Sequence, residues 1–199
     1  MKDAIDIKAL KENLNRDGFI VLRDYLSSLE VSELRDHAIP LVERLIQSRQ
    51  NTDHSTNLLK SLHRHDNWLQ SQLDNGRHVP LVQQLAEMEL RGCSVAWFDR
   101  SDGEITGVPP HFDVLRGQGS INAGVTVWVA LDLVNKNNGC LHYLRGSHKE
   151  IYPDQIFVEG VEIDAEDVSQ VEVKPGDVII HNALTLHWSG GNTSGMPRR

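Results

Sequence analysis

The chain has 199 residues, 39% hydrophobic and 24% charged, a length that suits one domain with a proper core and is short for two. Its formal net charge of −8 argues against a nucleic-acid or anionic-membrane partner, because phosphate groups bind clustered lysine and arginine. The sequence has no apolar run of the roughly 20 residues that span a membrane, no signal-peptide segment and only two isolated cysteines, Cys93 and Cys140, so we expect a cytoplasmic protein.

The first ninety residues are predicted to be mainly helical. Ile7, Leu10 and Leu14 recur at helical spacing until Gly18, which is a typical helix stop. Pro40 is expected to kink the longest of these helices. In chain order we expect a helix over 6–18, a short strand over 19–26, a helix over 29–48, a polar loop over 49–65 and a helix over 78–92.

From Cys93 onward the pattern changes to short segments rich in β-branched and aromatic residues, separated by Gly, Pro, Asn and Asp. Long intervening helices are missing from this pattern, which argues against a parallel βαβ arrangement. We therefore predict one α+β domain over 1–199, with a helical layer (1–92) packed on an antiparallel sandwich or barrel (93–199). The predicted strands lie in 93–98, 121–134, 171–180 and 183–190.

The predicted strand 121–134 alternates between two faces. One face carries valine and leucine at 125, 127, 129, 131 and 133, and the other carries Asn122, Gly124, Thr126, Trp128 and Ala130. A sheet with one buried and one solvated face would give this pattern. A barrel whose interior holds a polar ligand would give it too, with Asn122, Thr126 and Trp128 lining the cavity.

Metal-ligand residues occur close together in "VPPHFDVLRGQG", where His111 and Asp113 project to the same side of an extended segment. A mononuclear iron oxygenase needs one further histidine from another strand, so that three ligands occupy one face of the metal. Four later histidines compete for this role: His142, His148, His181 and His187. Ser189 and Arg198 follow the last of these, and they are the hydroxyl and guanidinium that would hold a buried dicarboxylate.

Four segments, in this order, resemble the phytanoyl-CoA dioxygenase family of Fe(II)- and 2-oxoglutarate-dependent oxygenases. They are "LNRDGFIVLRDYLSSLEVSELRD", "HFD", "WVALDLVNKNNGCLHYLRGSHK" and "VKPGDVIIHNALTLHWSGGNTSGMPRR". The resemblance covers nearly the whole chain. It implies a double-stranded β-helix, also called a jelly roll, behind the helical layer. It further implies hydroxylation of a small molecule with O2 and release of succinate and CO2.

The resemblance also implies roles for individual residues. His111, Asp113 and His187 would bind Fe(II). Arg198 would pair with the distal carboxylate of 2-oxoglutarate, supported by Ser189. The remaining cosubstrate pocket would be lined by Trp128, Thr126 and Asn122.

Two features depart from the family pattern. Arg145 stands where proline is common, and it either faces an anionic substrate or lies solvated in a turn. The family continues past its arginine into a further strand, whereas this sequence ends at Arg199, so either the chain is truncated there and lacks its C-terminal strand, or Arg198 sits on an unsupported end. Two other functions stay open: a non-catalytic jelly-roll binding protein that keeps the metal site, and a cupin-type hydrolase or isomerase with another metal.

Overall fold

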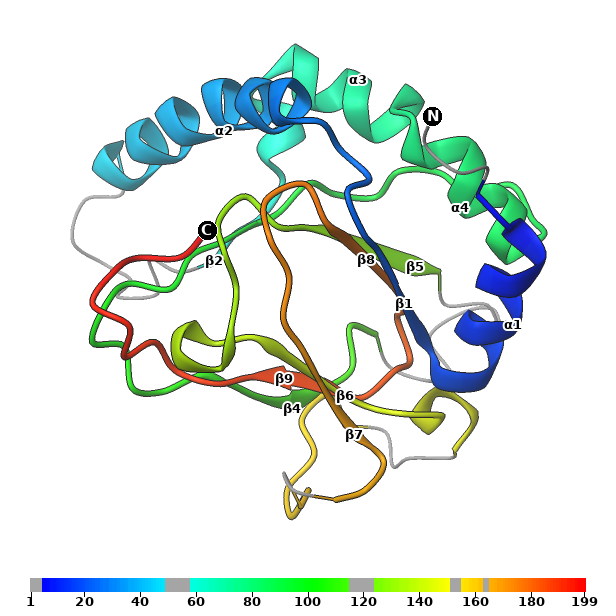
Figure 1. The fold of residues 1–199 in the computed structure, drawn as a ribbon. Helices are drawn as coiled ribbons and strands as arrows, with labels where there is room; N and C mark the ends of the chain where they lie inside the picture. Colours follow the sequence, from blue (N-terminus) through cyan, green and yellow to red (C-terminus); the bar gives the residue numbers. More distant parts are fainter. Residues whose placement is uncertain (1–4, 49–57, 115–123, 151–154, 163–164) are drawn as a thin grey trace.

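The computed structural model describes residues 5–48, 58–114, 124–150, 155–162 and 165–199. Two antiparallel sheets face each other below an arc of helices (Figure 1). The smaller sheet has the order β1 (Phe19–Leu22), β8 (Val178–Asn182), β5 (Val125–Val129). The larger sheet has the order β4 (Val108–His111), β9 (His187–Ser189), β6 (Leu141–Leu144), β7 (Val168–Val171). This architecture is the predicted double-stranded β-helix.

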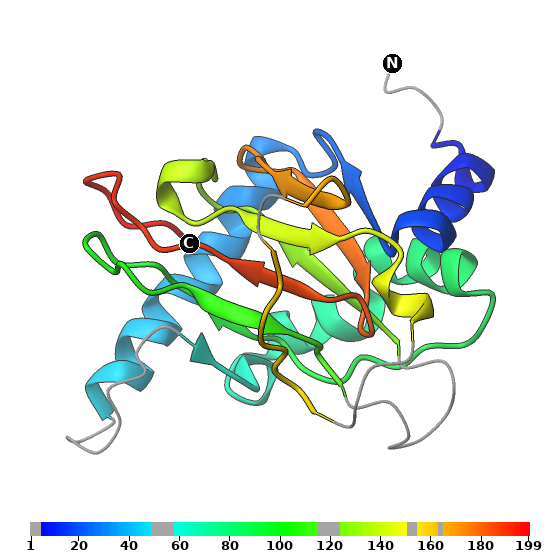
Figure 2. The same ribbon diagram turned by 90° about the horizontal axis from the view of Figure 1, so that it is seen from below.

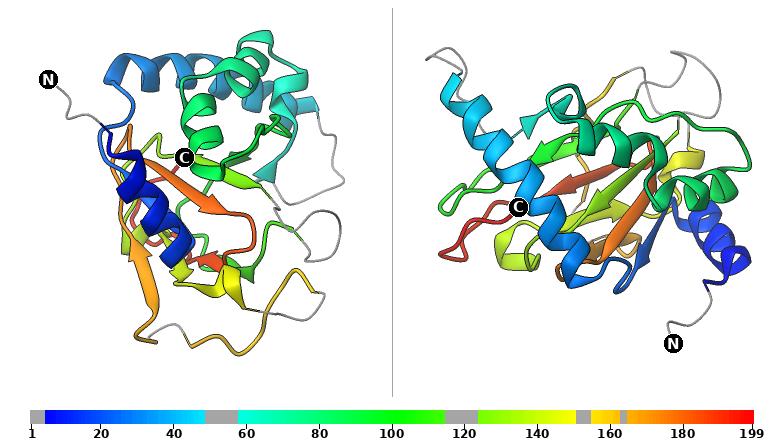
Figure 3. Two further views of the ribbon diagram at one scale, coloured as in Figure 1. Left: turned by 90° about the vertical axis from the view of Figure 1, so that its right-hand side faces the viewer. Right: turned by 90° about the horizontal axis from the view of Figure 1, so that it is seen from above.

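The helices cover the outer face of the smaller sheet, and α2 crosses over its strands when the molecule is seen from above (Figure 3). The larger sheet lies on the side away from these helices (Figure 2). The helices are α1 (Ile7–Asp17), α2 (Ser28–Ser48), α3 (Asn67–Asn75) and α4 (His78–Ala86). The shorter elements are β2 (Leu58–Leu59), β3 (Trp97–Phe98) and the 3-10 turns Leu62–Arg64, Lys136–Asn138 and Ser147–Lys149.

The first two predicted helices are confirmed. Asp6 caps α1 by accepting a hydrogen bond from the backbone N–H of Ala9, and Gly18 ends it in the left-handed conformation at φ +86°. α2 begins one residue earlier than predicted, and Ser27 and Glu30 form its capping box.

Two predictions for the helical half are wrong, and one helix was not predicted. The described part of the predicted polar loop contains β2 and the turn at 62–64, where Leu59 and Leu62 are buried. α3 was not predicted, although Asp66 caps its first turn. α4 ends at Ala86 rather than near Gly92, because Glu87 leaves the helix in a left-handed conformation at φ 52°.

The alternation along β5 has a clear structural meaning. Val125, Val127 and Val129 pack against the apolar cluster that α1 and α4 share with the sheet. Thr126 lies on the opposite face, where its hydroxyl donates to the Asp113 carboxylate. The structure therefore supports the interpretation in which this face lines the interior of the barrel. Asn122 lies outside the described residues.

The predicted strand 171–180 is two strands joined by a turn. β7 ends at Val171 and β8 begins at Val178, so consecutive strands belong to different sheets. Gly176 turns the chain at φ +90° and donates its N–H to the carbonyl of Ala130. In the described part of the chain, no helix is both long and apolar enough to cross a membrane.

Candidate metal centre

Three side chains of the predicted triad meet between the two sheets. His111 ends β4, Asp113 follows it, and His187 begins the neighbouring strand β9, directly opposite His111 in the register. One ligand atom from each residue lies within 4.8 Å of the others, and the two imidazole centroids are 4.3 Å apart. Nε2 of His187 is 3.7 Å from Oδ1 of Asp113. A single metal ion could bind all three.

Backbone carbonyls orient both histidines. Nδ1 of His111 is 2.9 Å from the carbonyl oxygen of Pro109, and Nδ1 of His187 is 2.9 Å from that of Thr185. A carbonyl can only accept, so each ring carries its proton on Nδ1 and presents the lone pair of Nε2. These are the tautomers that a divalent metal requires.

The protonation states also suit a cation. Burial raises the pKa of the Asp113 carboxyl, but the hydrogen bond from His181 and further nearby groups outweigh it and hold that pKa well below its usual range. Burial and the neighbouring His181 and His111 lower the pKa of His187 to about 3, and burial lowers the pKa of His111. At neutral pH the donor set is two neutral imidazoles and one carboxylate, which fits a mononuclear iron(II) site.

We expect the metal-free protein to lose stability as the pH falls from 6.5 towards 3. An unfolded chain protonates His187 near its ordinary pKa of 6.5, whereas the folded chain keeps it neutral down to about pH 3, so the unfolded state binds more protons. This difference amounts to about 2 kcal/mol at pH 5. Urea unfolding at pH 7 and pH 5 measures it. The pH dependence should shrink by this amount in His187→Gln, and an unchanged dependence would contradict the assignment.

The inner face of β5 leads from the triad to a buried arginine, Arg198. Trp128 is two residues beyond Thr126, which is about 6.5 Å along a strand, and the Arg198 guanidinium lies 5.9 Å from its ring centroid. Arg198 is 3% exposed and donates from Nε to the carbonyl of Asn138, which fixes its position. Burial and the charge of Arg100 lower the pKa of Arg198 to about 10, so it stays cationic at neutral pH.

Arg198 is supported by its neighbours, so the alternative in which it sits on an unsupported end is wrong. Arg198 exchanges both backbone hydrogen bonds with Arg100, at 2.8 and 2.9 Å. The side chain of Arg199 pairs instead with Asp132, at 3.3 Å, so Arg198 and not Arg199 faces Trp128.

Arg100 was not among the residues expected to hold the cosubstrate, but the structure places it beside one of them, Ser189. Its side chain is buried, with the residue 5% exposed, and Nη2 donates to the hydroxyl of Ser189 at 3.1 Å. Ser189 in turn packs closely against Gly107, where any Cβ would lie 1.7 Å from the Ser189 carbonyl oxygen. Arg100 also pairs with the carboxylate of Glu104 at 3.3 Å, and its charge helps to lower the pKa of Arg198, so two buried guanidinium groups lie near each other at this end of the site.

The Gly146-Ser147-His148 turn joins the site to the first helix. Ser147 Oγ accepts a hydrogen bond from the backbone N–H of Leu186, which precedes the ligand His187. His148 Nε2 lies 3.2 Å from the carbonyl of Asn15 near the C-terminal end of α1. These contacts support an architectural role for the turn.

Arg145 is not a free side chain in solvent, because it bonds to residues of the segment before and within β7. It donates to the hydroxyl of Ser169 and the carbonyl of Glu166, and its Nη2 lies 3.4 Å from the carboxylate of Asp167. These contacts tie it to the segment that leads into β7.

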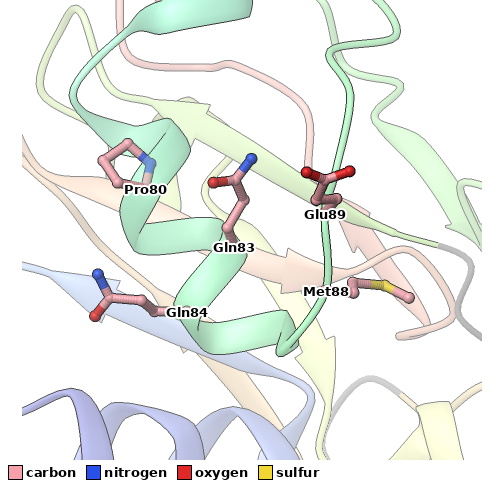
Figure 4. A pocket seen from close by; sticks show the side chains of 5 residues that line it. All are labelled: Pro80, Gln83, Gln84, Met88 and Glu89. Atoms are coloured by element: carbon pink, nitrogen blue, oxygen red, sulfur yellow. The ribbon is translucent and has the colours of Figure 1, made fainter.

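A separate surface pocket lies at α4 and the segment that follows it (Figure 4). It is lined by Pro80, Gln83, Gln84, Met88 and Glu89. This set offers one carboxylate and no imidazole, so it does not provide the ligands of an iron site.

Residues 14–199 match the model of a protein family described as "Phytanoyl-CoA dioxygenase (PhyH)". The chain belongs to the phytanoyl-CoA dioxygenase family. A curated member, the peroxisomal phytanoyl-CoA dioxygenase of Bos taurus, is 30% identical over 96 residues, which are 42% of this chain and 28% of that protein. The chain thus aligns with less than a third of the bovine enzyme.

Solved structures share the fold of this family member. The carbocyclase SnoK from nogalamycin biosynthesis, described as non-heme and alpha ketoglutarate dependent, superposes with a TM-score of 0.81 at 21% identity, covering 99% of this chain and 81% of its own. EctD from S. alaskensis, solved with 2-oxoglutarate and 5-hydroxyectoine, has a TM-score of 0.79 at 20% identity, and the match covers 100% of this chain and 75% of EctD. EvdO2 from Micromonospora carbonacea var. aurantiaca, solved with 2-oxoglutarate, has a TM-score of 0.72 at 18% identity, and the match covers 98% of this chain and 88% of EvdO2.

Proposed function

We propose that the protein is an Fe(II)- and 2-oxoglutarate-dependent dioxygenase that hydroxylates a small molecule. The observation that carries this proposal is the convergence of His111, Asp113 and His187, with both Nε2 lone pairs and an ionised carboxylate directed at one point. Membership of the phytanoyl-CoA dioxygenase family supports the same chemistry. When bound, iron would activate dioxygen, which is the oxidant, while 2-oxoglutarate would supply two electrons and leave as succinate and CO2.

The protein's own residues would hold the metal and orient the cosubstrate. Two neutral imidazoles and one carboxylate would leave three positions on one face of the metal for exchangeable ligands. Thr126 contacts Asp113, and Trp128, two residues further along the same face of β5, lies beside Arg198, so a diacid could extend along this face from the metal to the guanidinium. Arg198 would pair with the distal carboxylate, and the hydroxyl of Ser189, held by Arg100, would add a hydrogen bond.

Burial makes these interactions effective. Arg198, Ser189 and His187 are each less than 7% exposed, so a charge pair formed there is weakly screened by water. For the cellular compartment we propose the cytoplasm, because both cysteines, one exposed and one buried, are free thiols as in a reducing environment. Solved structures of the same fold with bound 2-oxoglutarate support the cosubstrate. One of them also holds 5-hydroxyectoine and another protein of this fold is a carbocyclase, so we assign the substrate only as a small molecule.

Addition of Fe(II) and 2-oxoglutarate to the protein without oxygen should produce a visible charge-transfer band. The band requires the keto acid to bind the same metal as the triad, so neither Fe(II) alone nor Zn(II) with 2-oxoglutarate should give it. Anaerobic absorption titration measures the effect. A folded protein that shows no band would count against the dioxygenase. A band without succinate release in air, across candidate substrates, would favour the non-catalytic binding protein.

A further inference from the structure

Two side chains from paired positions of the smaller sheet both contact one carboxylate oxygen of Asp113. The Thr126 hydroxyl donates to Oδ2 at 2.6 Å, and Nε2 of His181 lies 3.0 Å from the same atom. Thr126 on β5 and His181 on β8 are directly opposed partners in the register, so their side chains project together from the same face of the sheet. Strand pairing therefore sets the position of both donors.

His181 is itself held from the core. Since the ionised carboxylate of Asp113 only accepts, His181 carries its proton on Nε2, and Nδ1 accepts from the hydroxyl of Tyr143 at 2.9 Å. Tyr143 is completely buried on β6, and its ring stacks on Phe19 at 4.4 Å with an interplanar angle of 13°. The chain of contacts fixes both the tautomer and the orientation of His181.

The two oxygens of Asp113 consequently differ. A carboxylate oxygen has about two lone pairs, and on Oδ2 both face donors. Oδ1 lies nearer the metal ligands, 3.7 Å from Nε2 of His187. Among the described residues no donor bonds to Oδ1, so a metal ion would find free lone pairs on that oxygen.

We propose that His181 and Tyr143, together with Thr126, are positioning residues that restrict Asp113 to binding iron through Oδ1 alone. This inference rests on the proposed function. Its consequence is that the carboxylate occupies one position of the metal, so three positions stay open for the cosubstrates. A carboxylate that rotated to bind through both oxygens would occupy one of those positions.

Co(II) titration of the metal-free protein, with infrared difference spectra of the carboxylate, tests this role. In His181→Leu we expect Co(II) affinity to fall about 10–100-fold, the range seen when a partner of a metal ligand is lost. The splitting between the two carboxylate stretches should narrow, because the freed Asp113 can bind through both oxygens. His181→Gln keeps an N–H donor and should restore most of the affinity. Tyr143→Phe should weaken binding in the same direction by less.

His142→Leu is the matched control, since His142 is the neighbour of Tyr143 on β6 but faces the other side, stacked on Trp188. It should bind Co(II) like the wild type. Wild-type affinity and splitting in His181→Leu would overturn the inference. If that variant does not fold, unchanged affinity and splitting in Tyr143→Phe would overturn it. Failure of the wild type to bind Co(II) would instead refute the proposed function.

Discussion

Replacement of His187 by alanine is expected to abolish the iron-dependent band and to lower turnover by more than about 100-fold. Loss of a partner that only orients a metal ligand costs up to about 100-fold, and loss of the ligand itself should cost more. His187 is 5% exposed and opposes His111 across the β4–β9 pair, so a shortened side chain leaves a gap in the donor set. Succinate release and metal content measure the result.

The control for this experiment is again His142→Leu, which removes a histidine of the same sheet from its other face. It should keep the metal content and the turnover of the wild type. Full metal content in folded His187→Ala would show that the ion binds elsewhere.

Replacement of Arg198 by alanine is expected to raise the 2-oxoglutarate concentration needed for half-maximal rate by about a hundredfold. Removing one partner of a buried charge pair costs about 3 kcal/mol, which corresponds to that factor. Arg198→Lys should give an intermediate value, because it keeps the charge and loses the planar bidentate geometry. Initial rates at varied 2-oxoglutarate measure the effect.

Arg199→Ala provides the neighbouring control, since the Arg199 side chain pairs with Asp132 away from Trp128. Its requirement for 2-oxoglutarate should stay within a few-fold of the wild type. If Arg198→Ala were active and indifferent to 2-oxoglutarate, a cupin-type hydrolase or isomerase would explain the triad better.

The parts of the site with a distinctive spacing could be predicted from the sequence. His111 and Asp113 lie two residues apart in an extended segment, and their geometry follows from strand periodicity. The choice of His187 among four candidates needed the serine and arginine that follow it. The alternation along β5 predicted Thr126 and Trp128 on one face, but only the position of the opposing sheet shows what that face contacts.

Residues whose role depends on distant partners could not be found in this way. His181 lies in the apolar strand β8 like a buried core residue, and its significance arises from Asp113 and Tyr143, which are 68 and 38 residues away. Arg100 stands in a polar stretch typical of an exposed loop, but it is buried, with its backbone paired to Arg198 and its side chain bonded to Ser189. No local pattern records such a pairing.

In the helical half, helices with a clear apolar periodicity were predicted and those with a weak one were not. α1 has a cap at each end and a regular apolar face, so its limits were clear. α3 has nine residues with four amides and one carboxylate among them, and its apolar face is too short to stand out. Its stability comes from packing, since Leu69 is buried with residues of α2 and β3.

The Gly146-Ser147-His148 turn connects the first helix, α1, to the segment just before His187 near the other end of the sequence. Asn15 and Asp17 accept hydrogen bonds from it on one side, while Leu186 donates to it on the other. Unwinding the last turn of the first helix would therefore release the backbone immediately ahead of a metal ligand. Proteolytic removal of α1 is therefore expected to lower the metal affinity of the proposed triad through the backbone that carries His187.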